Sequence, residues 1–435
     1  MKVFLFIAGV LAFIPTGAVL VTVSHRYTRL LFVIMTLAPA LAVKMKFFPH
    51  DFYRGDARGY EINLADICAT ALLIGMALSP RYKKLILWPK NTWAFALFIL
   101  IALLSIFQSA MPLYGSFSFV QYLLAYQIFV ATYNVLRHDR KDLELAVNVF
   151  TVALGIQIFQ VVKEKYFLGI YRVIGTFGHP NTLSLYVEIL IPILLAVVLF
   201  SRLKYAFLYW AAILGGMFIV VSTYSRGGLV ILGGSIMMVL GLSFYQKATT
   251  RKAMILGLIL LAAVAGGIKA ADNIVNRFEN APESSGLTRI QYNNAARAIA
   301  GENLFGVGLN NFSHAVNNTK YGKYLDSNIT GHGVCHHIYW LFAAELGYPG
   351  LIAYLLMLAG FFIRAARLAL VRRPNYYNTL GLGVLGAYTA LHVHGMLEWV
   401  WRQVPVLYLF FTVSAFLLAA EEQFRREKAL ARMKR

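Results

Sequence analysis

The chain has 435 residues, of which 59% are hydrophobic and only 14% are charged, although 40 Lys and Arg against 19 Asp and Glu give a formal net charge of +21. A typical soluble domain carries about 25% charged residues, so the composition excludes an ordinary soluble protein. The 31 Phe and 25 Tyr exclude a disordered chain. Two cysteines, Cys68 and Cys335, are too few for a disulfide scaffold.

Apolar runs long enough to cross a bilayer, about 17–25 residues each, recur along the chain. They predict an all-α polytopic integral membrane protein, a single membrane domain over residues 1–435 with about 12 spans (12–13). The first run is interrupted by Pro15 and has no small-residue cleavage site, so we expect no cleaved signal peptide. The expected spans are 3–23, 29–46, 62–79, 92–110, 117–136, 143–162, 183–200, 206–222, 228–244, 253–271, 349–363, 378–398 and 404–420.

Basic clusters lie in alternate connections between these spans. The positive-inside rule assigns such connections, with the basic C-terminal tail, to the cytoplasm. The opposite connections then face the periplasm, and the longest of them, residues 272–348, is expected to be a large, partly helical loop. Because the positive charge is scattered over short loops, nucleic acid is the weaker explanation for it. The basic clusters are 81–84, 137–141, 202–204, 247–252 and 364–373.

Ionisable residues at the centres of spans are expensive in lipid and mark substrate or ion paths in transporters. The span centres are nearly free of them, apart from Asp66 and the stretch from His392 to Glu398. His394 and Glu398 are four residues apart, so we expect them to share a helix face, as a proton relay or as a packing pair. Polar residues gather instead at the outer span ends, which favours chemistry at the outer membrane face.

Three arginines on the expected outer side, Arg172, Arg226 and Arg289, stand in polar or glycine-containing contexts. A guanidinium group offers a fork of donors suited to phosphate oxygens, and glycine lets the backbone approach a phosphate closely. The alternative is that each arginine merely reaches toward lipid headgroups. Arg226 departs from the positive-inside pattern and is the strongest of the three.

A second cluster holds His332, Cys335, His336 and His337, followed by a pattern that predicts a short amphipathic helix ending in glycine and proline before span 349–363. A neutral histidine there could accept a proton from a hydroxyl group. The alternatives are structural histidines or a metal site, but no spacing matches a zinc motif. A thiol nucleophile at Cys335 lacks a visible base.

Four segments resemble the O-antigen ligase and polymerase family of bacterial envelope glycosyltransferases. Arg172–Asn181 is similar to the family's Arg-x-x-Gly-Thr-Phe-x-x-Pro-Asn, and Thr223–Gly227 is similar to its Ser-Arg-Gly stretch. The other two segments are Arg289–Phe312 and His336–Gly350. The order of the segments and the large outer loop also match, so the resemblance covers roughly residues 165–405.

The resemblance implies an O-antigen ligase, which transfers polysaccharide from undecaprenyl diphosphate to a sugar hydroxyl of lipid A-core at the periplasmic face of the bacterial inner membrane. Arg226 and Arg289 match arginines that contact the diphosphate, and Arg172 lies in a matching motif. His336 matches the family histidine nine residues before Glu345, but His337 stands where the family has Asn, so both are candidates for the general base. The expected supporting residues are Asn181, Glu345 and Glu398.

A lipid diphosphate is already a good leaving group, so arginines could replace a metal ion in stabilising its developing charge. We therefore expect a metal-independent glycosyltransferase without a cofactor, whose partners are the lipid-linked donor, lipid A-core and membrane lipids, and not nucleic acid. The alternatives are a polymerase of the same family, a transporter or flippase of lipid-linked glycans, and a structural scaffold for envelope assembly.

Overall fold

The structure is a computed structural model that describes residues 2–50, 53, 57–82, 84–90, 92–200, 205–261, 264, 283–326, 333–372 and 374–433. The regular secondary structure of these residues is helical apart from one short hairpin, which confirms an all-α membrane protein. Seven of the described helices are long and apolar enough to cross a membrane, and three further apolar helices are shorter. The chain is therefore a multi-pass membrane protein, while the count of about 12 spans stays a prediction.

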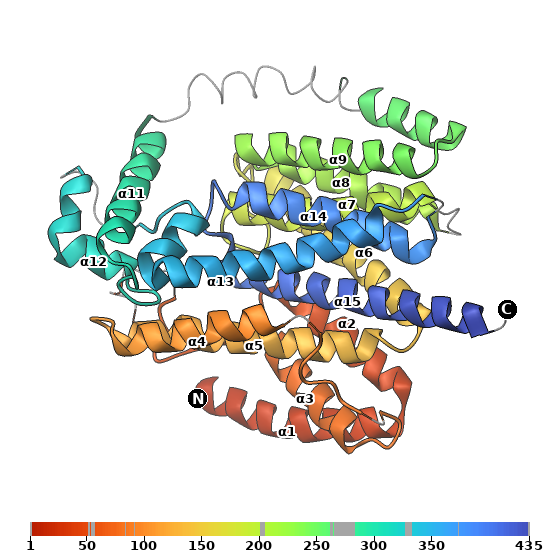
Figure 1. Cartoon of the computed structure of the whole chain (residues 1–435), viewed down its shortest axis with the longest axis horizontal. Helices are drawn as coiled ribbons and strands as arrows, with labels where there is room; N and C mark the ends of the chain where they lie inside the picture. The colour runs from red at the N-terminus through yellow and green to blue at the C-terminus, as the bar shows by residue number, and fades with distance from the viewer. Residues whose placement is uncertain are drawn as a thin grey trace. The chain divides into compact units, whose positions relative to one another are not determined.

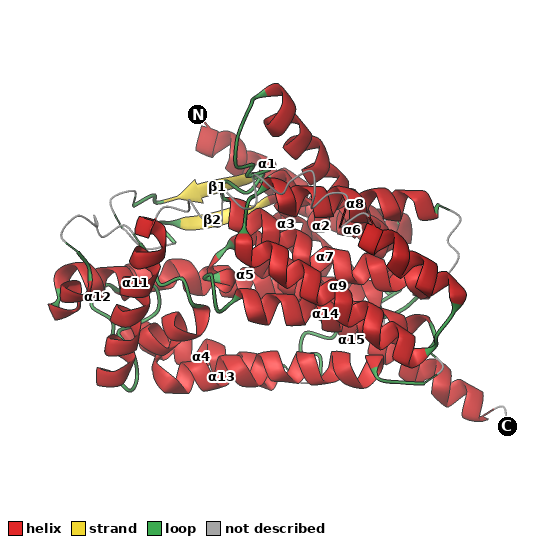
Figure 2. Ribbon diagram, turned by 90° about the horizontal axis from the view of Figure 1, so that it is seen from above, coloured by secondary structure: helices red, strands yellow, loops and turns green. Residues whose placement is uncertain are grey.

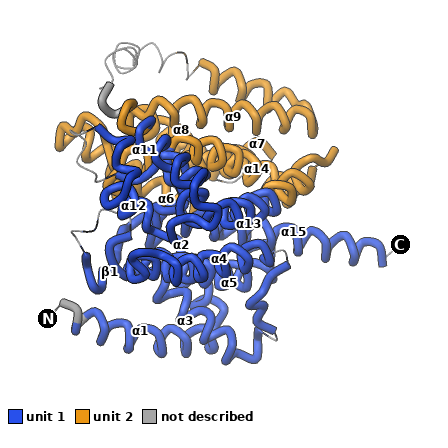
Figure 3. The backbone as a smooth tube through the Cα atoms, turned by 60° about the vertical axis from the view of Figure 1, so that its left-hand side comes forward, with its two compact units in different colours: residues 1–149, 290–361, 398–435 blue, residues 150–289, 362–397 orange. Residues whose placement is uncertain are grey.

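Figure 3 distinguishes two compact units of the chain. Unit 1 comprises Met1–Val149, Ile290–Phe361 and Glu398–Arg435, and unit 2 comprises Phe150–Arg289 and Phe362–Leu397. The expected site residues are divided between the units by sequence. Those in unit 2 are Arg172, Asn181, Arg226 and Arg289, and those in unit 1 are His336, His337, Glu345 and Glu398.

Unit 1 has an aromatic core against which its C-terminal helix packs. The fully buried Trp401 ring lies 4.9 Å from the rings of Tyr354 and Phe410. Burying such large rings supplies much of the packing in a helical membrane core. Outside its segment Ile290–Phe361, the helices that lie wholly in this unit are α1 (Lys2–Val23), α2 (His25–Leu41), α3 (Leu64–Leu78), α4 (Trp93–Phe107), α5 (Pro112–Leu136), η3 (Val400–Arg402) and α15 (Val404–Met433).

A two-stranded antiparallel sheet follows α2 and corrects the expected span 29–46. Strand β1 (Lys44–Phe47) pairs with β2 (Tyr60–Asn63), as Figure 2 shows in yellow. Helix α2 ends at Leu41 because Ala42 adopts a left-handed conformation with φ of 54°. Lys44, whose ammonium pairs with Glu61 at 3.0 Å, then belongs to a polar strand and not to an apolar span.

Unit 2 is organised around α7 (Pro180–Phe200), which is buried along almost its whole length. Figure 1 shows α8 (Ala206–Ser222), α9 (Arg226–Gln246) and α14 (Tyr376–His394) around it. A Cβ atom on Gly383 of α14 would lie 2.6 Å from the Cα of Ile193 on α7. Glycine therefore permits the close helix contact that stabilises packing in a membrane. Residues 250–261 are also helical.

Helices α6 (Arg140–Val162) and α13 (Ile338–Ala369) contribute residues to both units, and a π-helical turn, η1 (Lys163–Phe167), follows α6. Gly347 interrupts α13 with φ of 68°. A Cβ atom there would lie 2.1 Å from the carbonyl oxygen of Leu304, so the position requires glycine. This break confirms the expected short helix ended by glycine before a span.

The described part of the segment 272–348 contains three further helical elements: α11 (Glu283–Glu302), α12 (Phe312–Asn318) and the 3₁₀ turn η2 (Lys320–Tyr324). Residues 265–282 and 327–332, and with them His332, lie outside the described residues. The same holds for the second half of the expected span 253–271.

Candidate functional site

Arg172 and Arg226 are brought to one turn of unit 2, residues 223–226, which joins α8 to α9. The Nε atom of the half-buried Arg172 donates to the carbonyl oxygen of Thr223 at 3.1 Å. Arg226 is the first residue of α9, and its side chain is exposed. The N-terminus of a helix favours anions through its dipole and its unbonded N–H groups, so this turn presents positive charge in a form suited to phosphate.

The 223–226 turn contains one strained residue, followed by the N-cap of α9. Tyr224 adopts φ of 50°, a left-handed conformation that costs a residue other than glycine about 1–3 kcal/mol. Ser225 follows as the N-cap of α9, and its Oγ accepts a hydrogen bond from the backbone N–H of Gly228 at 3.2 Å. Backbone strain of this kind clusters at ligand sites.

A buried carboxylate holds the loop that carries Arg172. The Oε2 atom of Glu164 on η1 accepts hydrogen bonds from the backbone N–H groups of Ile174 at 2.8 Å and Gly175 at 3.0 Å. Gln157 accepts a third, from the N–H of Thr176 at 3.2 Å. Glu164 and Gln157 could not be recognised from the sequence, because their partners lie ten to nineteen residues further along the chain.

Beneath the first turn of α9 lies a buried polar group formed by Ser184, Glu188 and His394. The Oε2 atom of Glu188 is 2.8 Å from Nδ1 of His394, and the hydroxyl of Ser184 donates to Oε1 of Glu188 at 2.6 Å. A Cβ atom on Gly228 would lie only 2.0 Å from the Ser184 Oγ. Glu188 stands within the apolar run 183–200, so this span is an exception to the expectation that span centres are nearly free of ionisable residues.

The remaining unit 2 candidates lie on the helices α7 and α11. Asn181 is buried in the first turn of α7, where its backbone N–H donates to Nδ1 of His179 at 3.2 Å. Arg289 is half-buried on α11. The structure thus brings Arg172 to the 223–226 turn. The roles expected for Asn181 in support and for Arg289 in diphosphate binding stay predictions.

In unit 1, α11 fixes the segment that carries the two adjacent histidines. The hydroxyl of Tyr292 accepts from the backbone N–H of Gly333 at 2.8 Å, and the Cys335 thiol donates to Oδ1 of Asn293 at 3.1 Å. Burial raises the pKa of Cys335 to about 12. The thiol is therefore protonated at neutral pH, which argues against a thiolate nucleophile.

His336 is paired with a buried carboxylate. Its Nδ1 atom lies 3.1 Å from Oε2 of Glu398, and the side chains are 17% and 1% exposed, respectively. The Trp399 ring meets the imidazole edge-on with centroids 4.2 Å apart. No described residue bonds to Nε2, so the pair leaves one ring nitrogen available. The expectation that Glu398 shares a helix face with His394 is wrong, because α14 ends at His394.

His337 has a different environment at the start of α13. Its Nδ1 atom accepts a hydrogen bond from the backbone N–H of Trp340 at 3.4 Å. Burial lowers the pKa of His337, and the positive charge of Arg297 lowers it further. His337 is therefore a neutral residue that caps the helix start.

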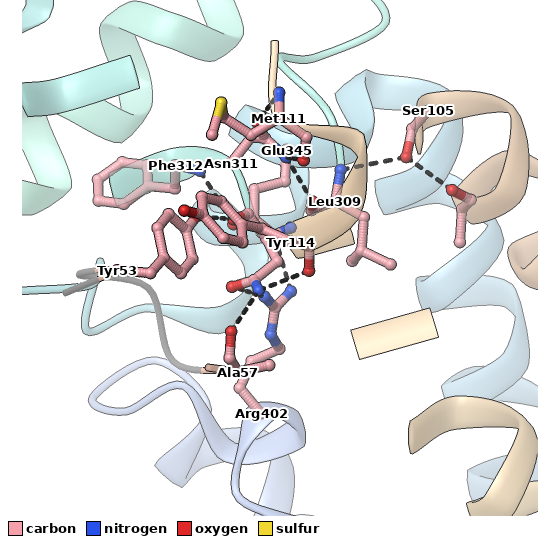
Figure 4. A network of polar contacts seen from close by, with 12 residues as sticks. Tyr53, Ala57, Ser105, Met111, Tyr114, Leu309, Asn311, Phe312, Glu345 and Arg402 are labelled. Carbon is pink, nitrogen blue, oxygen red and sulfur yellow. Dashed lines mark hydrogen bonds and ion pairs between the residues drawn. The ribbon is translucent and has the colours of Figure 1, made fainter. Parts of the chain in front are cut away.

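Glu345 anchors the segment after α11 to the short helix 338–346 (Figure 4). Its Oε2 atom accepts from Arg402 Nη1 at 2.7 Å and from the backbone N–H of Asn310 at 2.9 Å. Its Oε1 atom accepts from the N–H of Phe312 at 3.2 Å. Both side chains of the ion pair are 1% exposed. The carboxylate is therefore a fixed, fully buried part of unit 1.

Comparison with known protein families gives a match over the centre of the chain. Residues 210–355 match the model of the Wzy_C family, described as O-antigen ligase. This segment is an O-antigen ligase domain. The resemblance stated from the motifs is thereby confirmed. No curated protein sequence matches the chain significantly.

The matched segment supports an enzyme of the ligase and polymerase type for this chain. The matched range includes Arg226, Arg289, His336, His337 and Glu345. It leaves out Arg172 and Asn181 on one side and Glu398 on the other. The contacts described above tie Arg172 and Glu398 to residues of the O-antigen ligase domain.

Proposed function

We propose that this chain is an O-antigen ligase that transfers polysaccharide from undecaprenyl diphosphate to a sugar hydroxyl of lipid A-core. The observation that carries the proposal is the His336–Glu398 pair. A buried carboxylate on Nδ1 favours the tautomer with the proton on that nitrogen. The basic lone pair of Nε2 is then available for one defined task, the removal of a proton from the acceptor hydroxyl.

His336 is the general base in this proposal, and His337 is a positioning residue. The Nδ1 atom of His337 is engaged by the backbone N–H of Trp340 at the start of α13, so its loss would disturb the helix start. His336 bonds to a side chain instead, and its edge contact with Trp399 keeps the ring oriented.

Arg172, Arg226 and Arg289 bind the diphosphate in this proposal and stabilise the negative charge that develops as the glycosidic bond to the carrier breaks. The arrangement of Arg172 at the turn before α9 supports this role for the first two. The proposal requires neither a divalent metal nor a cofactor. Restoration of transfer by one particular metal after loss in EDTA would refute the metal-independent mechanism.

The proposal assigns the reaction to the periplasmic face of the inner membrane, with the segment 272–348 on that side of a single membrane domain. The orientation can be tested with Arg226→Cys, Arg289→Cys and Arg251→Cys in a background in which Cys68 and Cys335 are replaced by Ser. In intact spheroplasts a membrane-impermeant thiol reagent should label the first two and not the third. The opposite pattern would reverse the orientation.

The activity is tested by reconstituting the full chain in liposomes with undecaprenyl-diphosphate-linked glycan, with and without lipid A-core. Glycan on lipid A-core is the expected product. Longer carrier-linked glycan would instead identify a polymerase, and movement of glycan across the bilayer without any bond formation would identify a transporter.

A further inference from the structure

Lys165 is a cation held over two tyrosine rings in unit 2. Its ammonium group donates to the carbonyl oxygen of Tyr171 at 3.1 Å and to the hydroxyl of Tyr224 at 3.4 Å. It lies 5.5 Å from the ring centroid of Tyr171 and 4.8 Å from that of Tyr224. The two rings stack on each other, with centroids 4.6 Å apart and an interplanar angle of 14°. Four contacts therefore fix the position of this ammonium group.

No carboxylate neutralises Lys165 within the described residues. The nearest in sequence is Glu164, whose Oε2 accepts two backbone N–H groups and whose Oε1 accepts the amide of Gln160 at 3.2 Å. The negative faces of aromatic rings attract a cation but carry no net charge. Two of the three ammonium hydrogens are engaged by the tyrosines, so one donor remains available to an acceptor from outside the chain.

The held ammonium group belongs to the same turn as the candidate arginines. Tyr224 stands two residues before Arg226, and Arg172 donates to Thr223, the residue before Tyr224. Lys165 lies on the π-helical turn η1, and π-helical turns occur frequently at functional sites. Lys165 and Arg172 therefore donate to adjacent residues of this turn, Tyr224 and Thr223.

We propose that Lys165 is a third cationic ligand of the diphosphate of the lipid-linked donor, beside Arg172 and Arg226. The inference rests on the proposed function for the identity of the donor. A phosphodiester in a phospholipid headgroup offers the same oxygen acceptors with a single negative charge, whereas a diphosphate offers at least two. Three positive side chains match the diphosphate better. Tyr171 and Tyr224 orient the ammonium group and do not carry charge to the ligand.

The test uses the full-length protein in nanodiscs of neutral phosphatidylcholine and measures the dissociation constant for undecaprenyl diphosphate. Lys165→Met, which keeps the apolar stem, should bind about tenfold more weakly or worse, because a charge-assisted hydrogen bond is lost. Lys165→Arg should stay within about threefold of the wild type. The matched control is Lys163→Met, an exposed lysine on the same turn, which should bind like the wild type.

Wild-type binding of the diphosphate by Lys165→Met would overturn the inference. Equally weakened binding in Lys163→Met would also overturn it, because it would indicate a general electrostatic attraction and not a specific ligand. Displacement of the diphosphate by equimolar phosphatidylglycerol would assign the ammonium group to phospholipid headgroups and also overturn it. If Lys165→Met does not fold, Lys165→Gln is measured against the same criteria. Glycan transfer by the wild type is assayed separately, so a protein that binds the diphosphate but transfers nothing would refute only the proposed function.

Discussion

Oε2 of Glu398 lies 3.1 Å from Nδ1 of His336, although the two residues are 62 positions apart in the sequence. The carboxylate is 1% exposed, and a charge buried to this degree is normally retained only with a partner. The contact fixes the ring orientation and engages one nitrogen, which defines the other as the reactive one. In a base of this kind the orienting group contributes to the rate without touching the substrate.

Glu398→Gln should therefore lower kcat for glycan transfer by about tenfold or more while the KM for the donor stays near the wild-type value. The amide keeps the size of the side chain but loses the charge that stabilises a protonated imidazole. Trp399→Phe, which retains an aromatic edge contact, is the control and should stay close to wild-type turnover. An unchanged kcat in Glu398→Gln would remove Glu398 from the mechanism.

His336→Ala should reduce the transfer rate by about a hundredfold or more, with donor binding largely retained, as expected for loss of a general base. His337→Ala should lower the rate less, because its ring serves the start of α13. Transfer and donor binding are measured separately in detergent for both variants. A folded but inactive His337→Ala beside an active His336→Ala would move the role of base to His337.

The helices could be predicted from the sequence because each depends on a local property. Every expected span overlaps a helix of the described residues, since runs of about 20 apolar residues report bilayer thickness directly. The break at Gly347 was also readable, because glycine and Pro349 stand together at the end of an amphipathic pattern. The hairpin around Lys44 was missed, since a four-residue strand leaves little periodicity to detect.

Side-chain partners could not be predicted in the same way. From spacing alone, Glu398 was assigned to the helix face of His394, but a turn at residues 395–397 ends that helix. His394 pairs instead with Glu188, which is 206 residues away in the sequence. Such pairings depend on how helices pack, and no local pattern contains that information. The buried Arg402 was likewise not recognised, because its partner Glu345 lies 57 residues earlier.

The Glu345–Arg402 ion pair should be important for stability. Arg402→Met leaves the Glu345 carboxylate in a site that is 1% exposed, which should lower the free energy of unfolding by about 3–5 kcal/mol. In Glu345→Gln combined with Arg402→Met the loss should be smaller than the sum of the single losses, because the uncompensated charge is gone. Thermal unfolding in detergent measures both. Additive losses would mean that the two side chains do not interact.

His337 should make stability depend on pH. Its pKa in the folded protein is below the ordinary 6.5 because of burial and Arg297, so as pH falls through about 6.5 the unfolded chain binds a proton before the folded one. The contribution of the neutral ring to the free energy of unfolding is therefore fully present above that pH and is lost below it. His337→Asn does not titrate, so its melting temperature relative to the wild type should rise between pH 7.5 and pH 5. A constant difference would contradict this.

Two glycines of α9 offer a matched comparison for the packing under Arg226. In Gly228→Ala the new Cβ would lie 2.0 Å from Oγ of Ser184 and 2.9 Å from Oε1 of Glu188, so we expect a loss of about 1–3 kcal/mol in stability and weaker donor binding. In Gly233→Ala nothing lies within 4 Å of the new Cβ, so better helix propensity should stabilise the protein by about 0.5–1 kcal/mol.

Because the clash is with the Ser184 hydroxyl, Ser184→Ala should restore part of the stability and donor binding lost in Gly228→Ala, although it also removes a hydrogen bond to Glu188. The comparison is made in one detergent on the wild type, Gly228→Ala, Gly233→Ala and Gly228→Ala combined with Ser184→Ala. Melting temperatures and dissociation constants for undecaprenyl diphosphate are measured for each. If Gly228→Ala and Gly233→Ala behave alike, the first turn of α9 does not depend on close contact with α7. A loss of stability in Gly228→Ala with unchanged donor binding would separate the packing of this turn from recognition of the diphosphate.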